Sequence, residues 1–409
     1  RRIAIPDRIR LRGTAGADKG AFSAASTLST DGGEIALQGR LDTRSEAYGI
    51  ELRCDSFPLN SFLPADSLGL LDLALQAGGS GFDPLRAQTR GNIRLQVDRA
   101  EFRGRDFGGV KLNANLEGGQ LSGRLSDRDE ALRLLLLISG TLTERKQEVR
   151  LTGNVFDFDL AELGISPQKI GGSFALEAGA SASDAGSYTA RIALDSIEVR
   201  TRHRTDRIRP TSLSLSSDTT ATRAKLASGD LSLAFVSPGP VDSLVPALTR
   251  STDILAQQIR AQSVDMEALK PALPDFSLSV TAGRENILNN FLKTKKVSFG
   301  ALDIEGVNCD SLPVSLRIKA ERLAWGGVVL DTLTAGIAQD GRRLDYFLRT
   351  ANVPGNLDNV ALAGLYGHVA GNRGQVNLCQ KNRAGREGFR FGLDVAWNDS
   401  LVRAGVTPP

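Results

Sequence analysis

Apolar and polar residues alternate along most of the chain. The alternation is clear at Leu71, Leu73 and Leu75, and again over residues 389–397, with polar or charged residues between the apolar positions. A period of two residues places successive side chains on opposite faces of a β-strand. Short turn sequences such as Glu117-Gly118-Gly119 separate these segments. The sequence therefore predicts a mainly β protein, an elongated repeat array of antiparallel strands with one apolar and one polar face.

We expect the apolar residues of these strands to line a hydrophobic groove. The predicted lining residues are Leu71, Leu73, Leu75, Ile93, Leu95, Val97, Val110, Leu112, Leu116, Phe174, Leu176, Ile192, Leu194, Leu213, Leu215, Val314, Leu316, Ile318, Phe389, Phe391, Leu393 and Val395. A transmembrane β-barrel would carry aromatic girdles, and the chain has only 4 Tyr and 2 Trp. A long curved sheet remains, and its groove is either filled by its own side chains or open to acyl chains. The alternation alone does not choose between these two arrangements.

One region departs from the period of two. From Val241 to Thr294 the apolar residues recur at helical spacing, first around Leu244 and Leu248 and later after Asn286, a good helix-starting residue. Proline removes a backbone donor, so we expect Pro246 to lie in a first turn. The pattern predicts two amphipathic helices that cover part of a sheet, with a short strand at 276–280 between them.

Segments of the chain also resemble one another. Leu73, Leu75 and Ala77 have counterparts 101 residues further on, because 174 − 73 = 101, at Phe174, Leu176 and Ala178. A unit of roughly 100 residues that recurs is typical of a repeat architecture. We expect groove modules over 1–240 (about 30–130 and 131–240), a helical insertion over 241–295, and a further groove module over 296–409.

Composition excludes several functions. The formal net charge is only +3 and the charges are interspersed, whereas a nucleic-acid binder has a basic stripe. The 2 His and 3 Cys have no metal-ligand spacing, and we expect Cys54, Cys309 and Cys379 to be small apolar fillers. The chain contains neither a nucleophile motif nor a phosphate-binding loop. We therefore expect a protein that is not an enzyme and that uses no metal or cofactor.

One cluster of charge stands out. Arg200, Arg202 and Arg204 alternate, so we expect them to share one face of a strand. They form either a solvated face, with Asp206 nearby, or a contact for anionic lipid headgroups or an acidic partner.

The start of the chain affects the prediction of location. The sequence begins at Arg1, and its only methionine is Met266. We therefore expect a segment of a longer protein, with any membrane anchor outside it. No apolar run approaches the length of about 20 residues that a membrane helix needs.

The residue pattern of four segments resembles that of a known family. Ala100–Asp127, Gly283–Leu292, Leu316–Asp345 and Gln375–Ser400 are similar to the AsmA-like superfamily, and more narrowly to its TamB family (translocation and assembly module subunits) of the type found in Bacteroidetes. The resemblance implies a β-taco groove and a periplasmic protein that is anchored in the inner membrane by an N-terminal helix. It also implies an outer-membrane barrel assembly protein as partner, phospholipid acyl chains in the groove, and no nucleic acid.

Together, the pattern and the resemblance predict a periplasmic bridge that supports phospholipid transport, outer-membrane protein translocation and assembly, or both. The alternative is a structural, adhesin-like surface protein of β-repeats without a lipid groove. Long Ser/Thr-rich faces would favour the adhesin, whereas the predicted helical insertion favours the bridge.

Overall fold

The computed structural model describes residues 8–63, 68–183, 186–309, 311–352, 362–382, 386–398 and 401–407. Of these residues, 68% lie in strands and 10% in helices, so the prediction of a mainly β, antiparallel fold is confirmed. The chain divides into two compact units, Arg1–Ile208 (unit 1) and Arg209–Pro409 (unit 2). The repeat modules deduced from the sequence are a different division of the chain and stay a prediction.

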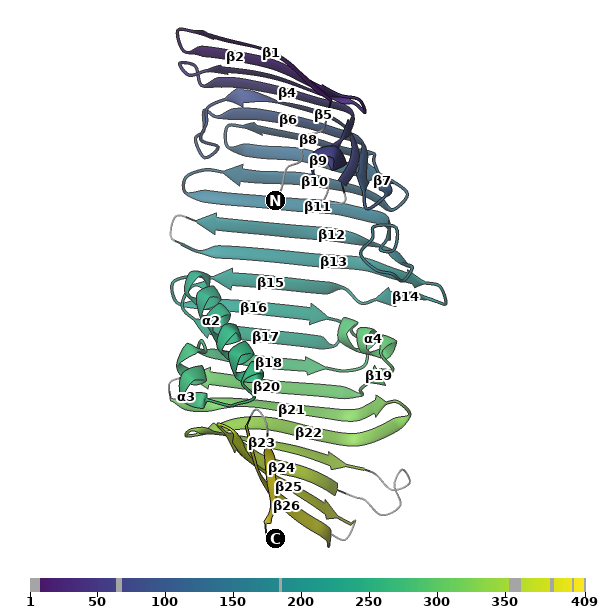
Figure 1. Ribbon diagram of the computed structural model, residues 1–409, viewed down its shortest axis with the longest axis vertical. Coiled ribbons are helices and arrows are strands. Elements are labelled where there is room, and N and C mark those ends of the chain that lie inside the picture. The colour runs from purple at the N-terminus through teal and green to yellow at the C-terminus, as the bar shows by residue number, and fades with distance from the viewer. Residues whose placement is uncertain are drawn as a thin grey trace. The chain divides into compact units, whose positions relative to one another are not determined.

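Unit 1 is an open sheet of strands that pair in chain order (Figure 1). The short strand β7 pairs with β6, and the short strand β14 pairs with β13. Every described pairing in the unit is antiparallel. Among the described residues no pairing joins β1 to the far end of the unit, so the sheet is open. Its elements are β1 (Ile9–Asp18), β2 (Ala21–Thr30), β3 (Glu34–Asp42), β4 (Ala47–Pro58), α1 (Leu59–Phe62), β5 (Leu68–Ser80), β6 (Arg90–Phe102), β7 (Arg105–Phe107), β8 (Val110–Glu117), β9 (Gln120–Arg128), β10 (Leu132–Leu142), β11 (Lys146–Asp159), β12 (Ile170–Ser183), β13 (Tyr188–Thr201) and β14 (Thr205–Ile208).

Unit 2 combines a second antiparallel set of strands with the helical insertion. Its strands also pair in chain order, except that β18 pairs with β20 and the short β19 pairs with β21. The helices α2 and α3 and a short 3-10 helix η1 are inserted between β17 and β18, and α4 lies between β18 and β19. Its elements are β15 (Thr211–Ser217), β16 (Ala221–Ser228), β17 (Leu231–Pro238), α2 (Val241–Arg260), α3 (Met266–Leu269), η1 (Lys270–Ala272), β18 (Phe276–Ala282), α4 (Ile287–Thr294), β19 (Val297–Ser298), β20 (Ala301–Cys309), β21 (Leu312–Trp325), β22 (Val328–Asp340), β23 (Arg343–Ala351), β24 (Leu362–Ala370), β25 (Arg373–Lys381), β26 (Glu387–Trp397) and β27 (Val402–Thr407).

Tight turns close the hairpins at the positions that the sequence indicates. Gly118 and Gly119 have φ angles of 59° and 74° and join β8 directly to β9. A two-residue hairpin turn with positive φ at both positions matches the right-handed twist of the flanking strands, and glycine adopts this conformation without steric cost. The turn fixes the pairing of Glu117 with Gln120 and hence the register of the whole hairpin.

Several strands contain a bulge that the alternation does not predict. Ser196 of β13 has a φ of 51°, and the pairing of β13 with β12 shifts register at this point. Ser56 of β4 repeats the arrangement, with a φ of 47° and a register shift between Cys54 and Phe57. One extra residue reverses the phase of the alternation. Each bulge therefore lets apolar residues three positions apart lie on the same face.

The helical insertion follows the prediction for α2, α4 and the strand between them, but it also contains α3 and η1, which the sequence did not predict. The predicted strand is β18, and the side chain of Asn286 caps α4 by accepting a hydrogen bond from the N–H of Asn289 at 2.8 Å. The expectation for Pro246 is wrong, because this proline lies inside α2, beyond its first turn. Its ring is on the exposed side of the helix, where the carbonyl that loses its intrahelical donor is within reach of water.

The bulge at Ser196 leads to a prediction about stability. Replacing Ser196 by Val places a β-branched side chain at positive φ, and we expect a loss of unfolding free energy of about 1–2 kcal/mol. Ser196→Gly fits this conformation and should be neutral or stabilising. Ala193→Val, at a regular position of the same strand, is the matched control. Chemical denaturation followed by circular dichroism measures all three, and equal stability of Ser196→Val and Ala193→Val would refute the bulge.

Candidate functional site

The strand registers of unit 1 bring the predicted apolar residues onto one face. Residues that lie directly opposite in an antiparallel pair point to the same side of the sheet. Pairing therefore joins leucines of β3 to β6 and β8 to β10, and of β12 and β13, into one ladder that is interrupted only by Gly153 of β11. The ladder consists of Leu37, Leu52, Leu75, Leu95, Leu112, Leu125, Leu136, Gly153, Leu176 and Leu194. We call this side the apolar face of unit 1 and the other side its polar face.

All thirteen predicted residues of unit 1 lie on this apolar face. Leu73 is opposite Val97, and Val97 is opposite Val110, one step along the strands from the leucine ladder. On the other side of the ladder, Ile93 pairs with Ala77 and Ala114. The intervening residues, such as Lys111 and Asn113, point to the polar face.

Unit 2 has an equivalent apolar face. Its pairings join Leu215, Ala224, Phe235, Leu278, Gly306, Leu316, Ile337, Tyr346, Gly367, Val376, Leu393 and Val406. The nine predicted residues of this unit lie on or beside this row. The assignment of both sets of residues to one face within each unit is therefore consistent with every described register.

The two apolar faces are only partly covered. Of the twenty-two predicted lining residues, Val314 alone is buried, with 9% of its surface exposed. Ile93, Ile192, Leu213, Phe389 and Phe391 are exposed, and the remainder are half-buried. Core residues of a closed sandwich would be buried by a second layer. The described residues supply no such layer over most of these faces.

A cavity of about 660 Å³ opens at the strands β1 to β4 of unit 1. It is lined on the apolar face by small residues, among them Ala15, Ala17 and Ala24, and by the larger Phe22 and Leu41. Small side chains beside large ones leave space above the sheet, and this space is of the size that small-molecule ligands occupy.

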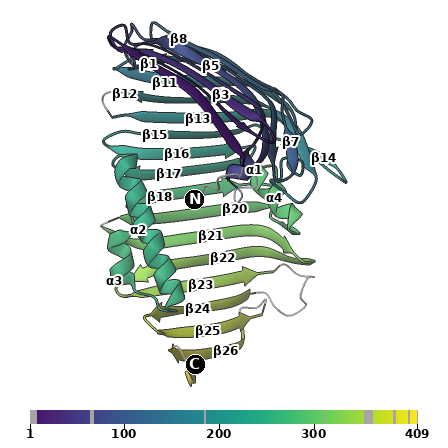
Figure 2. The same cartoon turned by 45° about the horizontal axis from the view of Figure 1, so that its top comes forward.

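In unit 2, helices pack on the apolar face at both ends of the strands (Figures 1 and 2). At one end, Met266 and Leu269 of α3 pack on Val314, with Leu344 beside them. At the other end, Leu288 and Leu292 of α4 join a cluster around Leu231, Val280, Ala282 and Phe299. The middle of the strands, including Leu215 and Leu316, lies between these two helical attachments.

Buried polar side chains attach the insertion to the strands. Ser217 accepts a hydrogen bond from the N–H of Val241 at 2.8 Å, at the start of α2. Ser237 donates to the carbonyl of Asp275 at 2.7 Å, and Asn308 donates to the carbonyl of Pro274 at 2.9 Å. Eight of the ten buried polar side chains among the described residues lie in the insertion or on the strands beneath it: Ser217, Thr222, Ser228, Ser237, Ser251, Asn286, Asn289 and Asn308.

The opposite attachment, at α4, is organised by one carboxylate. Asp230 accepts hydrogen bonds from the N–H of Glu285 at 2.9 Å and from the side chain of Asn286 at 2.6 Å. Burial opposes the ionisation of Asp230, but these hydrogen bonds outweigh it and lower the pKa of its carboxyl. The charged form of Asp230 therefore holds α4 against the turn between β16 and β17.

Helix α2 has an apolar surface that the sheet covers only in part. Leu244 is 6% exposed and lies on the packed side of the helix with Ser251. A neighbouring stripe on the same helix remains exposed, with Leu248 at 44% and Ile259 at 75%, and includes Val245 and Leu255. The helical spacing of the apolar residues predicts an apolar side of α2, but it does not show which part of that side packs on the sheet.

The arginine cluster differs from the expectation. Only Arg200 lies in β13, and it pairs with Asp157 of β11. Arg202 and Arg204 lie in the turn between β13 and β14, so the prediction that the three share a strand face is wrong. Arg204 instead pairs with Asp206 at 2.7 Å. Strand β13 ends at Thr201, so the alternation of the three arginines does not continue along a strand.

A buried carboxyl lies on the apolar face of unit 1. Asp127 is 7% exposed and pairs with Leu134. Burial is the largest influence on its carboxyl and raises the pKa, and the negative charge of Asp129 raises it further. The N–H of Asp129, which donates to Asp127 at 2.9 Å, opposes this rise without cancelling it.

Comparison of the chain with protein-family models, with curated proteins and with solved structures gives no match. Among the described residues, no helix combines the length and the apolar character needed to cross a bilayer. The functional interpretation therefore depends on the geometry of the two apolar faces.

The environment of Asp127 predicts a pH dependence. Because the pKa is raised in the folded state, ionisation of Asp127 opposes folding, and its cost appears as the pH rises through and above the ordinary range of an aspartate. Asp127→Asn keeps the acceptor for the N–H of Asp129 and removes the charge. We expect this variant to be more stable than the wild type at pH 7 and equal to it at pH 3, in thermal unfolding. The polar-face variant Glu177→Gln is the control, and a stability gain at both pH values would contradict the assignment.

Proposed function

We propose that the protein is a non-enzymatic bridge in the periplasm whose apolar faces bind the acyl chains of phospholipids. In this proposal it supports phospholipid transport, outer-membrane protein translocation and assembly, or both. The observation that carries the proposal is the partial exposure of twenty-one of the twenty-two predicted lining residues. Large contiguous apolar surfaces on soluble domains mark sites of interaction.

The chemistry of the faces favours acyl chains as the occupant. The leucine ladder offers a row of aliphatic side chains with cross-strand spacing of about 5 Å and without fixed polar groups at its centre. Each acyl CH₂ that such a surface removes from water contributes about 0.8 kcal/mol. A flexible chain gains this free energy at any position along the row, which suits movement rather than retention at one point.

An adhesin-like structural repeat explains the same features less well. Its stability would require the apolar face to be filled by its own side chains, as in a closed sandwich. The helices of unit 2 instead cover the face at the two strand ends and leave Leu213 44% exposed between them. The inner-membrane anchor and the outer-membrane barrel partner belong to the proposal through the resemblance to the TamB family.

The experiment that tests the proposal combines lipid analysis with charge insertion. Protein purified without detergent should carry phospholipid that mass spectrometry detects. We expect Leu112→Arg, Leu316→Arg and Leu393→Arg to fold, because a half-buried arginine stem can carry its charge to water. Each variant should retain less lipid and should fail to complement loss of the gene, because the charge interrupts the aliphatic row.

Lys111→Glu and Asp394→Lys are the matched controls, since both residues are exposed on the polar faces. They should change neither lipid content nor complementation. If the three arginine variants unfold, the faces are sealed cores, because an unpaired charge in a core costs several kcal/mol. A folded wild type that carries no lipid would also contradict the proposal.

The exposed stripe of α2 yields a separate prediction. We propose that Leu248 and Leu255 contact acyl chains, so the double variant Leu248→Gln, Leu255→Gln should keep its stability and retain less lipid. Glutamine preserves helix propensity, and neither leucine is buried. Leu244→Ala should instead destabilise unit 2 by about 2–5 kcal/mol, because Leu244 is packed.

Arg250→Gln combined with Asp253→Gln, on the polar side of α2, is the control for lipid content. Denaturation curves and mass spectrometry on the same preparations separate the two effects. Loss of stability in the leucine pair would mean that the stripe is part of the core rather than a lipid contact.

A further inference from the structure

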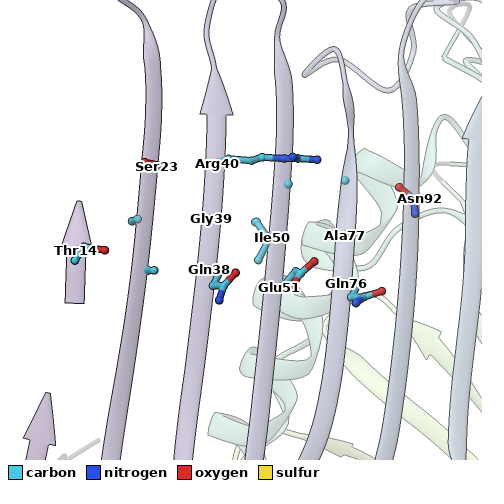
Figure 3. A pocket seen from close by; sticks show the side chains of 14 residues that line it. Thr14, Ser23, Gln38, Gly39, Arg40, Ile50, Glu51, Gln76, Ala77 and Asn92 are labelled. Carbon is cyan, nitrogen blue, oxygen red and sulfur yellow. The ribbon is translucent and has the colours of Figure 1, made fainter. Parts of the chain in front are cut away.

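A second cavity opens on the polar face of unit 1, opposite in chemistry to the apolar face. It has a volume of about 470 Å³ and lies over β1 to β6. Figure 3 shows the polar side chains that line it, with the side chain of Arg40 extended above a row of Gln38, Glu51 and Gln76. Thr14 and Asn92 lie at the two ends of this lining.

The floor of this cavity is formed by residues that have little or no side chain. Gly49 and Gly78 pair directly with each other and continue the row that begins with Arg40. A Cβ atom at Gly49 would lie 2.8 Å from Nε of Arg40, so the arginine lies flat across this glycine. A Cβ atom at Gly78 would meet nothing closer than 3.4 Å, so space remains beyond the arginine.

The lining carries one basic and one acidic side chain, Arg40 and Glu51. Arg40 is exposed and forms no ion pair with any residue that the structure describes. Arg94 lies directly opposite Gln76 on the same face and adds a second positive charge at the end of the row. Glu51 is the one acidic side chain in the lining, beside Gln38 and Gln76.

We propose that this cavity binds an acidic oligosaccharide. A guanidinium group presents a planar fork of donors that fits a carboxylate, and Arg40 lies extended across Gly49 without an ion pair to a described residue. Gln38, Gln76 and Asn92 offer both donors and acceptors, which match the hydroxyl groups of a sugar, and Glu51 accepts from a hydroxyl. The lining has no aromatic ring on which a nucleobase would stack, so the site suits a saccharide rather than a nucleotide.

This proposal does not depend on lipid binding, because the cavity and the leucine ladder use opposite faces of the same strands. The probes are tetragalacturonic acid and its methyl ester, which has the same sugar backbone without the carboxylate charges. Isothermal titration calorimetry on the full chain should show binding of the acid at least tenfold tighter than binding of the ester.

Two variants locate the site. Arg40→Gln should abolish the preference for the acid, and Gly78→Val should weaken binding of both probes by filling the floor. The controls are Gly39→Val and Arg191→Gln. The backbone of Gly39 belongs to the lining, but a side chain at this position would point into open space on the apolar face. Arg191 lies on the polar face of distant β13. Circular dichroism and thermal unfolding check that each variant is folded.

The results expected are loss of acid preference in Arg40→Gln, weaker binding in Gly78→Val and wild-type binding in both controls. The proposal is overturned if the wild type does not bind the acid, or if Arg40→Gln binds it as well as the wild type does. An equal loss in Arg191→Gln would also overturn it, because it would show diffuse attraction between a basic surface and an anion.

Discussion

The structure depends on one constraint of antiparallel pairing, which is that directly opposite residues point to the same side of the sheet. The ladder from Leu37 to Leu194 crosses ten strands of unit 1 only because each strand joins its neighbour in the correct phase. A slip of one residue would move the whole apolar set of a strand to the polar face. Since the apolar face is only partly buried, contacts between neighbouring leucines within the ladder supply much of the preference for the correct register.

The bulges follow from the same constraint, and they mark the limit of what the alternation could predict. A period of two can be read from a single strand, so the strands and the membership of each face were predictable from residues such as Leu73, Leu75 and Leu112. The phase reversals at Ser56 and Ser196 required the partner strand. Both follow a shared sequence signal, an apolar residue, Asp, Ser and a second apolar residue, in Cys54–Phe57 and Leu194–Ile197.

The helical insertion shows the difference between local and distant causes. The capping role of Asn286 is local and was predictable, since its partner is the N–H three residues later. The buried serines and asparagine beneath the insertion were not predictable, because the carbonyl groups that accept hydrogen bonds from Ser237 and Asn308 belong to residues 275 and 274, on another segment. Pro246 was misplaced because the amphipathic period of α2, supported by packing, outweighs the loss of one exposed hydrogen bond.

Alternation also separates the two kinds of ligand proposed for unit 1. Neighbouring residues such as Gly39 and Arg40 point to opposite faces, so no side chain serves both the leucine ladder and the cavity beside Arg40. Binding at one face gains free energy from area removed from water, while binding at the other gains it from charge and hydrogen bonds. Salt therefore weakens the second kind of binding and leaves the first largely unchanged. Any coupling between the faces passes through the strand backbone that they share, as a change of strand register or twist.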